Sequence, residues 1–533
     1  MKRCRHALLA TGSIALVATA FLSLCLRDQL RGDLAVQTLI HLRDFSVYFW
    51  GQDRYFSLVP LLLLWNQDAE TGLYLTAALN AISFFAVPYL LLEALDNTQV
   101  DNKNRTLDSA LLKRLITLAV FACVITLTWS QEELYFFVKD ASPFPLSTAL
   151  GFLSVFLWCR PAQEAKIPRT RHRLPRIASG VLILLSLLVA PTTAGLSAAF
   201  LMVVLATRAS QSGQQAKIWK LGKEAMKYLS ACLFAYLIIQ AGDVALRIPK
   251  LTSYSQSSGI GLIPSAMQSL HAIWAERTNA GNNRWLSLIP FLTLPLAGLR
   301  LSKGCINIMP ASRNAIAINP LTLLWTYAGI ALLVFSSLKW VAQNGYHFRY
   351  QYPLYVAWSA STLTAINATW QVAFERISHL HLKIINQVAI AVAIAAFGLS
   401  LLLRPTLNEA ATVRKALAAY QWMEEQHVTV IGGDYWSSWP LYLWSQRTGS
   451  TWPLESVAHR SSSNFASHDR IRAQSAKRFL AGSPVPMACM GTANVQTCIS
   501  QYKEVVGNQT TIQFASKEGN DLPADVAFIT FFK

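Results

Sequence analysis

The chain has 533 residues, of which 53% are hydrophobic and only 14% are charged, and its mean hydropathy is +0.33. Soluble domains carry about 25% charged residues, so this composition excludes a set of ordinary soluble domains. The net charge of +18 would also suit a nucleic-acid binder. However, residues 1–403 hold 34 Lys and Arg against 18 Asp and Glu, whereas residues 404–533 hold 12 against 10. A positive excess among hydrophobic segments is typical of a membrane protein and argues against nucleic acid as a partner.

A helix that crosses the bilayer needs about 20 apolar residues. Eleven runs approach this length and predict a polytopic α-helical membrane protein, with spans near residues 7–26, 73–92, 111–129, 143–159, 177–190, 194–207, 228–246, 284–300, 318–340, 353–374 and 384–403. The first run follows three basic residues and also fits a cleaved signal peptide. Its length favours a retained anchor.

Residues 177–207 admit either one long span or a hairpin around Pro191-Thr192-Thr193. Both flanks are rich in Lys and Arg, so both are expected in the cytoplasm, and the chain must then turn back between them. This topology places the N-terminus in the cytoplasm. It predicts a membrane domain at residues 1–403 and an extracytoplasmic domain at residues 404–533. The outer loops of the membrane domain are then 27–72, 130–142, 247–283 and 341–352.

The C-terminal 130 residues read as a small α/β domain. Residues 407–426 have a helix-forming composition, and Val428–Ile431 followed by two glycines predicts a buried strand and a turn. Strand-like runs recur at 512–514 and 527–532. Cys489 and Cys498 are the only cysteines in this domain, and an oxidising compartment would join them in a disulfide. Two free thiols are the alternative.

The first outer loop carries a polar helical stripe. At 100° per residue, Asp33, Gln37, His41 and Asp44 fall within an arc of about 80°, with apolar residues around much of the remainder. This pattern predicts a helix over residues 33–49 that lies in the membrane interface. Its polar stripe is either a functional site or a solvated face. The aromatic stretch that contains Trp50 and Gln52 follows directly and favours function.

Two further outer loops carry candidate groups. Glu132 and Glu133 stand at the mouth of a helix, where they would bind a cation or orient an acceptor hydroxyl, or would only face water. A later loop presents Arg349 and Tyr350 among aromatic residues. The planar guanidinium of Arg donates two parallel hydrogen bonds to a phosphate, whereas an interfacial aromatic belt is the alternative reading.

Other functional motifs are missing from the sequence. It has no Walker or Rossmann glycine pattern, which argues against a cytosolic nucleotide as sugar donor or energy source. The predicted spans are poor in charged residues, which coupled transporters place at the membrane midplane. Polar residues gather instead at one membrane face. This distribution favours an enzyme that acts on a lipid whose head group lies at the outer surface.

Several short motifs together resemble the bacterial polytopic glycosyltransferases of the GT-C superfamily. In the first loop these are Gly32-Asp33-Leu34-Ala35 and the segment Tyr48-Phe49-Trp50-Gly51-Gln52-Asp53-Arg54. Arg349 and Tyr350 are similar to an Arg-Tyr motif that opens a late span in that superfamily. The aromatic segment Gly433-Asp434-Tyr435-Trp436-Ser437-Ser438-Trp439-Pro440-Leu441 resembles part of its C-terminal periplasmic domain.

The resemblance implies transfer of a sugar from a polyprenyl-phosphate donor to a glycan, lipid or protein of the cell envelope, at the outer face of the plasma membrane. It implies that Asp33, or Asp44, is the catalytic carboxylate. Three groups of further residues receive roles: acceptor or metal orientation for Glu132, Glu133 and His41, donor-phosphate binding for Arg349 and Tyr350, and sugar or lipid contact for Trp50, Gln52, Tyr435 and Trp436.

A divalent cation, Mg²⁺ or Mn²⁺, held by Asp33 and Glu132, stays open as the cofactor. Asp33 departs from the commoner pattern because Leu34, and not a second acid, follows it. Two alternative functions also remain. One is a transporter or flippase for lipid-linked glycans. The other is a polysaccharide polymerase or ligase, which the basic residues of loop 247–283 favour.

Overall fold

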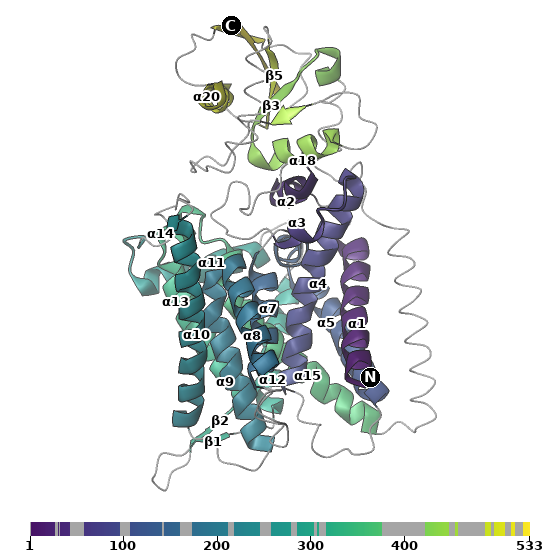
Figure 1. The fold of residues 1–533 in the computed structure, drawn as a ribbon, viewed down its shortest axis with the longest axis vertical. Helices are drawn as coiled ribbons and strands as arrows, with labels where there is room; N and C mark the ends of the chain where they lie inside the picture. Colours follow the sequence, from purple (N-terminus) through teal and green to yellow (C-terminus); the bar gives the residue numbers. More distant parts are fainter. Residues whose placement is uncertain are drawn as a thin grey trace. The chain divides into compact units, whose positions relative to one another are not determined.

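The structure is a computed structural model of the whole chain (Figure 1). It describes residues 2–26, 30, 32–42, 58–95, 107–140, 143–159, 173–211, 218–245, 257–278, 285–302, 306–308, 316–375, 422–446, 454–456, 485–491, 495–506, 513–517 and 526–532. These residues are mostly helical, and a small sheet lies in the C-terminal part. A mostly helical fold with a small C-terminal sheet is therefore confirmed.

The chain divides into two compact units. The first, here the helical unit, comprises Met1–Phe21, Ala81–Val138 and Ser142–Ser400. The second, here the mixed unit, comprises Leu22–Asn80, Lys139–Ala141 and Leu401–Lys533. This division differs from the boundary at residue 403 that the sequence suggests, because the first outer loop belongs to the same compact unit as the C-terminal domain.

The described residues up to 95 include the helices α1 (Lys2–Cys25), α2 (Gly32–Leu42), α3 (Leu58–Leu62) and α4 (Ala69–Leu95). The helical unit continues with α5 (Leu107–Thr128), α6 (Gln131–Leu134), the π-helix η2 (Tyr135–Lys139), α7 (Pro143–Cys159), α8 (Arg173–Val189), the 3₁₀ turn η5 (Pro191–Thr193), α9 (Ala194–Gln211) and α10 (Ile218–Ala245). The remaining described elements of this unit are α11 (Leu262–Thr278), α12 (Trp285–Leu301), the hairpin strands β1 (Ile306–Ile308) and β2 (Ile316–Ile318), α13 (Pro320–Ser336), α14 (Lys339–Gln343), the 3₁₀ turn η7 (Phe348–Gln351) and α15 (Tyr352–Glu375).

The segment 177–207 is two helices and not one long span. Ser147 near the start of α7 donates to the carbonyl of Ser186, whereas Ser179 donates to the carbonyl of Ser154, so α7 and α8 are antiparallel. The rings of Phe152 and Phe200 stack with centroids 3.8 Å apart, and Arg208 donates to the carbonyl of Cys159, so α9 runs parallel to α7. The chain therefore turns back at η5, where Pro191 lacks the N–H that a continuous helix needs.

Three helices are long and apolar enough to cross a membrane within the described residues: Ala69–Leu95, Pro191–Arg208 and Trp219–Gly242. A fourth is reached if the bent pair Gln131–Lys139 and Pro143–Cys159 counts as one span. Four more apolar helices are shorter, and the predicted span 384–403 lies outside the described residues. The predicted total of eleven spans is not confirmed, because several apolar runs form helices of 17 residues, about 26 Å long, or less.

The C-terminal domain contains a five-stranded sheet in the order β4-β3-β5-β7-β6. Its strands are β3 (Val430–Gly433), β4 (Glu455–Ser456), β5 (Val485–Met490), β6 (Gln513–Lys517) and β7 (Val526–Phe532), and its helices are α18 (Tyr435–Ser445) and α20 (Val495–Val506). Strands β3, β4 and β5 are parallel, whereas β7 runs antiparallel to β5 and β6. Strands β3, β6 and β7 lie at the three strand-like runs of the sequence.

The core of this domain is apolar and is tied at one point by a covalent bond. Val430, Met487 and Ile529 from the sheet pack against Ile499 and Tyr502 from α20. Burial raises the pKa of the Tyr502 phenol to about 12, so it stays neutral at physiological pH. The structure joins Cys489 of β5 to Cys498 of α20 in a disulfide, the pair that the sequence analysis anticipated.

Candidate functional site

The central residue of the site, Glu133, takes part in the cap at the N-terminus of α6. Ser130 is the N-cap residue, and its hydroxyl accepts from the backbone N–H of Glu133 at 3.0 Å. The Glu133 carboxylate accepts in return from the backbone N–H of Ser130 at 2.7 Å. This reciprocal capping box follows from the local Ser-x-x-Glu pattern. It turns the carboxylate back into the protein, where the Glu133 side chain is fully buried.

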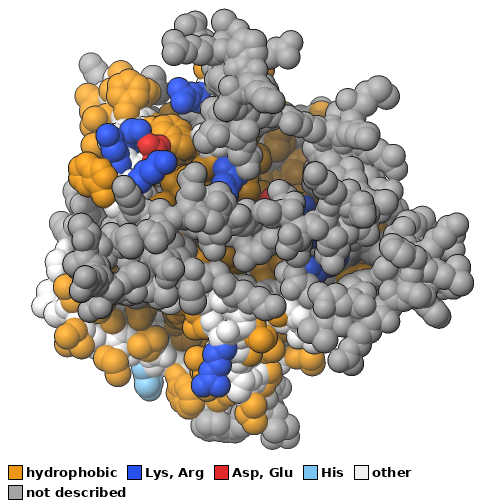
Figure 2. All heavy atoms as spheres, turned by 90° about the horizontal axis from the view of Figure 1, so that it is seen from below, with side chains coloured by type: hydrophobic (Ala, Val, Ile, Leu, Met, Phe, Trp, Pro, Cys, Tyr) orange, Lys and Arg blue, Asp and Glu red, His pale blue; other side chains and the backbone are white. Residues whose placement is uncertain are grey.

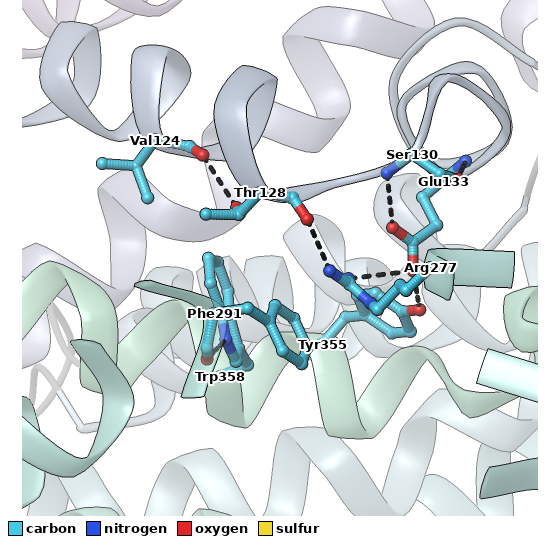
Figure 3. A network of polar contacts seen from close by, with 8 residues as sticks. All are labelled: Val124, Thr128, Ser130, Glu133, Arg277, Phe291, Tyr355 and Trp358. Atoms are coloured by element: carbon cyan, nitrogen blue, oxygen red, sulfur yellow. Dashed lines mark hydrogen bonds and ion pairs between the residues drawn. The ribbon is translucent and has the colours of Figure 1, made fainter. Parts of the chain in front are cut away.

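A buried ion pair joins Glu133 to a distant helix. The guanidinium Nη2 of Arg277 on α11 lies 2.9 Å from Glu133 Oε1, and the two side chains are 2% and 0% exposed. The phenol of Tyr355 on α15 donates to the same carboxylate oxygen. Figure 3 shows how the three side chains converge. Since a buried charge is costly unless it is paired and hydrogen-bonded, each group depends on the others.

The guanidinium of Arg277 has two further contacts. Its Nη1 donates to the carbonyl of Thr128 at 2.5 Å, at the C-terminus of α5 where helix carbonyls lack intrahelical donors. Its Cζ lies 3.5 Å from the centroid of the Phe291 ring on α12, which is a cation–π contact. Arg277 thereby links α5, α6, α11 and α12, and Figure 3 shows it between Thr128 and Glu133. Its Nε has no hydrogen-bond partner among the described residues.

Aromatic rings cover the ion pair. Trp129 packs edge-on against Tyr355 with centroids 5.1 Å apart, and Trp358 stacks on Phe291 at 5.1 Å. The indole of Trp358 donates to the Phe291 carbonyl at 2.7 Å, which fixes α15 against α12. These apolar walls lower the local dielectric, so the charges attract more strongly than they would in water.

A second cluster lies on the turn that leads into α15. Arg349 on η7 is partly exposed, and its Nη2 donates to the phenol oxygen of Tyr350 at 2.6 Å. Its Cζ lies 5.4 Å from the ring centroid of Phe136 on η2. The ring of His347 packs on Phe136 at 4.7 Å. The segment α6–η2, which carries Glu132 and Glu133, and the Arg349 turn are therefore side by side in the helical unit, although more than 200 residues separate them.

The backbone before Arg349 is strained. Gly345 has φ +63°, and Tyr346 has φ +55°, a conformation that costs a non-glycine residue about 1–2 kcal/mol. Tyr346 is 9% exposed, and its phenol has no hydrogen-bond partner among the described residues. Strain and an unsatisfied polar group on one residue are typical of turns that are kept for function.

Asp33 lies in the mixed unit and is buried at the first turn of α2, with 1% of its side chain exposed. Gln37, one turn later, accepts from the Asn80 amide at 2.8 Å, and that amide also donates to the carbonyl of Lys139 at 3.1 Å. The Lys139 ammonium donates to the carbonyl of Leu26 at 2.6 Å. Because Asp33 and Gln37 are both buried, the solvated interfacial face that the sequence allowed is wrong for this part of the helix, which ends at Leu42 within the described residues.

Helix α18, which carries the aromatic segment of the C-terminal domain, packs against α2 within the mixed unit. Trp439, Tyr442 and Trp444 are 1–3% exposed, so these rings serve as packing groups, whereas Trp436 stays partly exposed. Tertiary structure thus joins the first-loop helix to the aromatic segment of the tail.

The remaining predicted site residues fall into two groups. Glu132 is partly exposed, whereas Glu133 is buried and both of its carboxylate oxygens are engaged. Asp44, Trp50 and Gln52, and the side chains of His41 and Tyr435, lie outside the described residues. Among the side chains that are described, no three His, Cys, Asp or Glu residues cluster to hold a metal ion. The proposed cation at Asp33 and Glu132 stays a prediction.

Sequence reasoning missed Arg277 and Tyr355 as members of this site. In the sequence Arg277 is only one of the basic residues of segment 247–283, whereas in the structure it lies on α11, which forms within that segment. No spacing rule relates residue 133 to residues 144 and 222 positions later in the chain. The one local signal was a single Arg in the last turn of an otherwise weakly charged helix.

Comparison of the chain with models of protein families, with curated proteins and with solved structures found no match.

Proposed function

We propose that the chain is an integral membrane glycosyltransferase that moves a sugar from a polyprenyl-phosphate donor to an acceptor in the cell envelope. The observation that carries this proposal is the packing of the second outer loop against the Arg349 turn in the helical unit. Glycosyl transfer from a lipid phosphate requires a guanidinium or another cation near the departing phosphate, and carboxylates near the incoming hydroxyl. Partly exposed Arg349 and Glu132 supply both kinds of group on adjacent segments.

The buried ion pair has a positioning role in this proposal. Glu133, Arg277 and Tyr355 are buried and bind one another, so none of them is available to bind a substrate. Their contacts fix α6, which carries Glu132, against α11 and α15, the second of which follows the Arg349 turn directly. A fixed spacing between the phosphate-binding cation and the acceptor-orienting carboxylate is what lowers the entropic part of the barrier.

Arg349 is the phosphate-binding group. Its hydrogen bond from Nη2 to Tyr350 and its position over Phe136 orient the planar guanidinium, and partial exposure leaves it accessible to a lipid head group. The negative charge that develops on the leaving polyprenyl phosphate is stabilised there.

The test uses purified full-length protein, a panel of undecaprenyl-phosphate hexoses and pentoses, and an envelope extract as acceptor. Release of undecaprenyl phosphate and the mass gain of the acceptor are followed by mass spectrometry. Arg349→Ala is expected to lower transfer about 100-fold, the usual loss when one donor to a developing negative charge is removed. Arg349→Lys, which keeps the charge without the fork, is expected to lose less.

Arg300→Ala is the matched control, because Arg300 is an exposed arginine at the end of α12 and has no role in the proposal. It is expected to transfer sugar at the wild-type rate. Equal activity of Arg349→Ala and Arg300→Ala would refute the assigned role. Movement of a labelled lipid across proteoliposomes, with no mass gain in any acceptor, would favour a flippase instead.

A further inference from the structure

Helix α10 has one buried face and one open face. Its buried residues are Leu221, Ala225, Tyr228, Cys232, Ala235 and Ile239. At 100° per residue they fall within an arc of about 80°. The phenol of Tyr228 makes the polar contact of this face, since it hydrogen-bonds to Ser154 of α7 at 2.5 Å. This face packs α10 against α8 and α9.

The open face combines large apolar side chains with three lysines. The apolar members, 49–78% exposed, are Trp219, Met226, Leu233, Phe234, Leu237 and Ile238. Lys220, Lys223 and Lys227 are exposed as well and stand in the first three turns. On the helical wheel all nine fall within an arc of about 140° on the side away from the buried face. The lysines therefore lie in line with Phe234 and Ile238 and not beside them.

This order along the helix matches the order of groups in a phospholipid. The helix is one of the three candidate membrane spans, and only 28% of its most apolar window is buried inside the protein. Lysines at the first turns, followed by uncovered apolar rings and chains, present cations to a head group and an apolar surface to its acyl chains. Trp219 at the very start is the residue type that prefers the boundary between them.

The charge on this face is not cancelled by its surroundings. Lys227 pairs with Glu224 at 2.5 Å, an exposed bridge one turn away. Lys220 and Lys223 have no ion-pair or hydrogen-bond partner among the described residues. Figure 2, which views the protein from below, shows a group of Lys and Arg side chains with one acidic side chain among them, lying between hydrophobic side chains. A net positive group next to an apolar surface favours an anionic lipid over a zwitterionic one.

We propose that the open face of α10 is a binding site for an anionic phospholipid, with Lys220 and Lys223 on the phosphate of the head group and Phe234, Leu237 and Ile238 along its acyl chains. The inference rests on the membrane location that is part of the proposed function. It is independent of the sugar-transfer chemistry, because none of these residues belongs to the candidate site.

The experiment measures binding of dioleoylphosphatidylglycerol and of dioleoylphosphatidylcholine to full-length protein by native mass spectrometry. The wild type is expected to bind phosphatidylglycerol more tightly than phosphatidylcholine. Its affinity for phosphatidylglycerol is expected to fall as the salt concentration is raised. A cation near an anionic lipid surface contributes about 1 kcal/mol, which is about fivefold in affinity. The triple variant Lys220→Gln, Lys223→Gln, Lys227→Gln is therefore expected to bind phosphatidylglycerol at least 25-fold more weakly.

Two control variants protect this conclusion. The triple Lys→Arg variant keeps the charges and is expected to bind like the wild type, and Lys339→Gln removes an exposed lysine of α14 without effect. Equal binding of the two lipids, or wild-type affinity in the triple Gln variant, would overturn the site. If the protein binds phosphatidylglycerol selectively but transfers no sugar, the lipid site is supported and the proposed glycosyltransferase activity is refuted.

Discussion

The Glu133 cluster and the C-terminal domain both connect segments that lie far apart in the chain, but they use different groups. Around Glu133 the connection is ionic: Arg277 and Tyr355 reach one carboxylate from α11 and α15. In the C-terminal domain it is neutral. Gln501 of α20 exchanges two hydrogen bonds with the backbone of Gly433, at 2.7 and 3.1 Å, and a disulfide joins Cys489 to Cys498.

This difference determines what a substitution leaves behind. Removal of one half of this ion pair leaves the other charge buried and unpaired, which costs far more than the pair itself contributes. Removal of a disulfide leaves two small neutral groups, and its main effect is on the entropy of the unfolded chain. We therefore expect the helical unit to be the more sensitive of the two to single polar substitutions.

The largest effect is expected at the ion pair. Either Glu133→Leu or Arg277→Leu alone is expected to lower the free energy of unfolding by about 3–5 kcal/mol, because the remaining partner is a buried unpaired charge. The double variant is expected to lose clearly less than the sum of the two. Unfolding midpoints of detergent-purified protein measure all four members of this cycle. Additive losses would show that the two charges act independently.

An intermediate effect is expected at the disulfide. Replacing Cys489 and Cys498 by Ala is expected to destabilise the C-terminal domain by about 2–3 kcal/mol, since the closed loop is short. Limited proteolysis measures this loss, and a reducing agent should reproduce it in the wild type but not in the double variant. Cys123→Ala, which removes an exposed free thiol of α5, is the control. A reductant without effect on the wild type would contradict the bond.

A smaller effect on stability is expected from substitutions that test the packing of helices in the helical unit and change no charge. A Cβ at Gly298 of α12 would lie 1.7 Å from the carbonyl oxygen of Ser361 on α15, so Gly298→Ala must push the two helices apart. The expected loss is about 1–3 kcal/mol. Gly329 of α13 has no atom within 4 Å of its Cβ position, and Gly329→Ala is expected to stabilise by about 0.5–1 kcal/mol. Equal melting temperatures for both variants would argue against close packing of α12 and α15.

Several elements followed from local pattern. The strands at 430–433 and 526–532 were predictable because short buried apolar runs end in glycine or charge. The turn at Pro191 was predictable from proline and from basic flanks on both sides. The count of eleven spans was not reached, because hydrophobic composition does not determine where a helix ends, and Pro290 and Pro295 sit within one of the short helices.

The candidate site was only partly predictable. Glu133 and Arg349 stood out because a charged residue at the mouth of an apolar helix is conspicuous in a chain that is poor in charge. Arg277 and Tyr355 did not stand out, because their role depends on which helices lie next to α6. The sequence placed Asp33 on a polar stripe that was either a functional site or a solvated face, and packing in the mixed unit buries Asp33 and so excludes the solvated face.

By itself the amino-acid sequence determined the helical class, the α/β tail, the cysteine pair and the residues at helix mouths, because each depends on periodicity or on neighbours within a few positions. Tertiary structure alone decided that the Glu133 carboxylate binds both Arg277 and Tyr355. It also decided that the lysines of α10 lie on the same exposed face as its large apolar side chains. Those outcomes depend on which faces of the helices meet. Residues that contact each other across more than 100 positions of the chain cannot be recognised from a local sequence pattern.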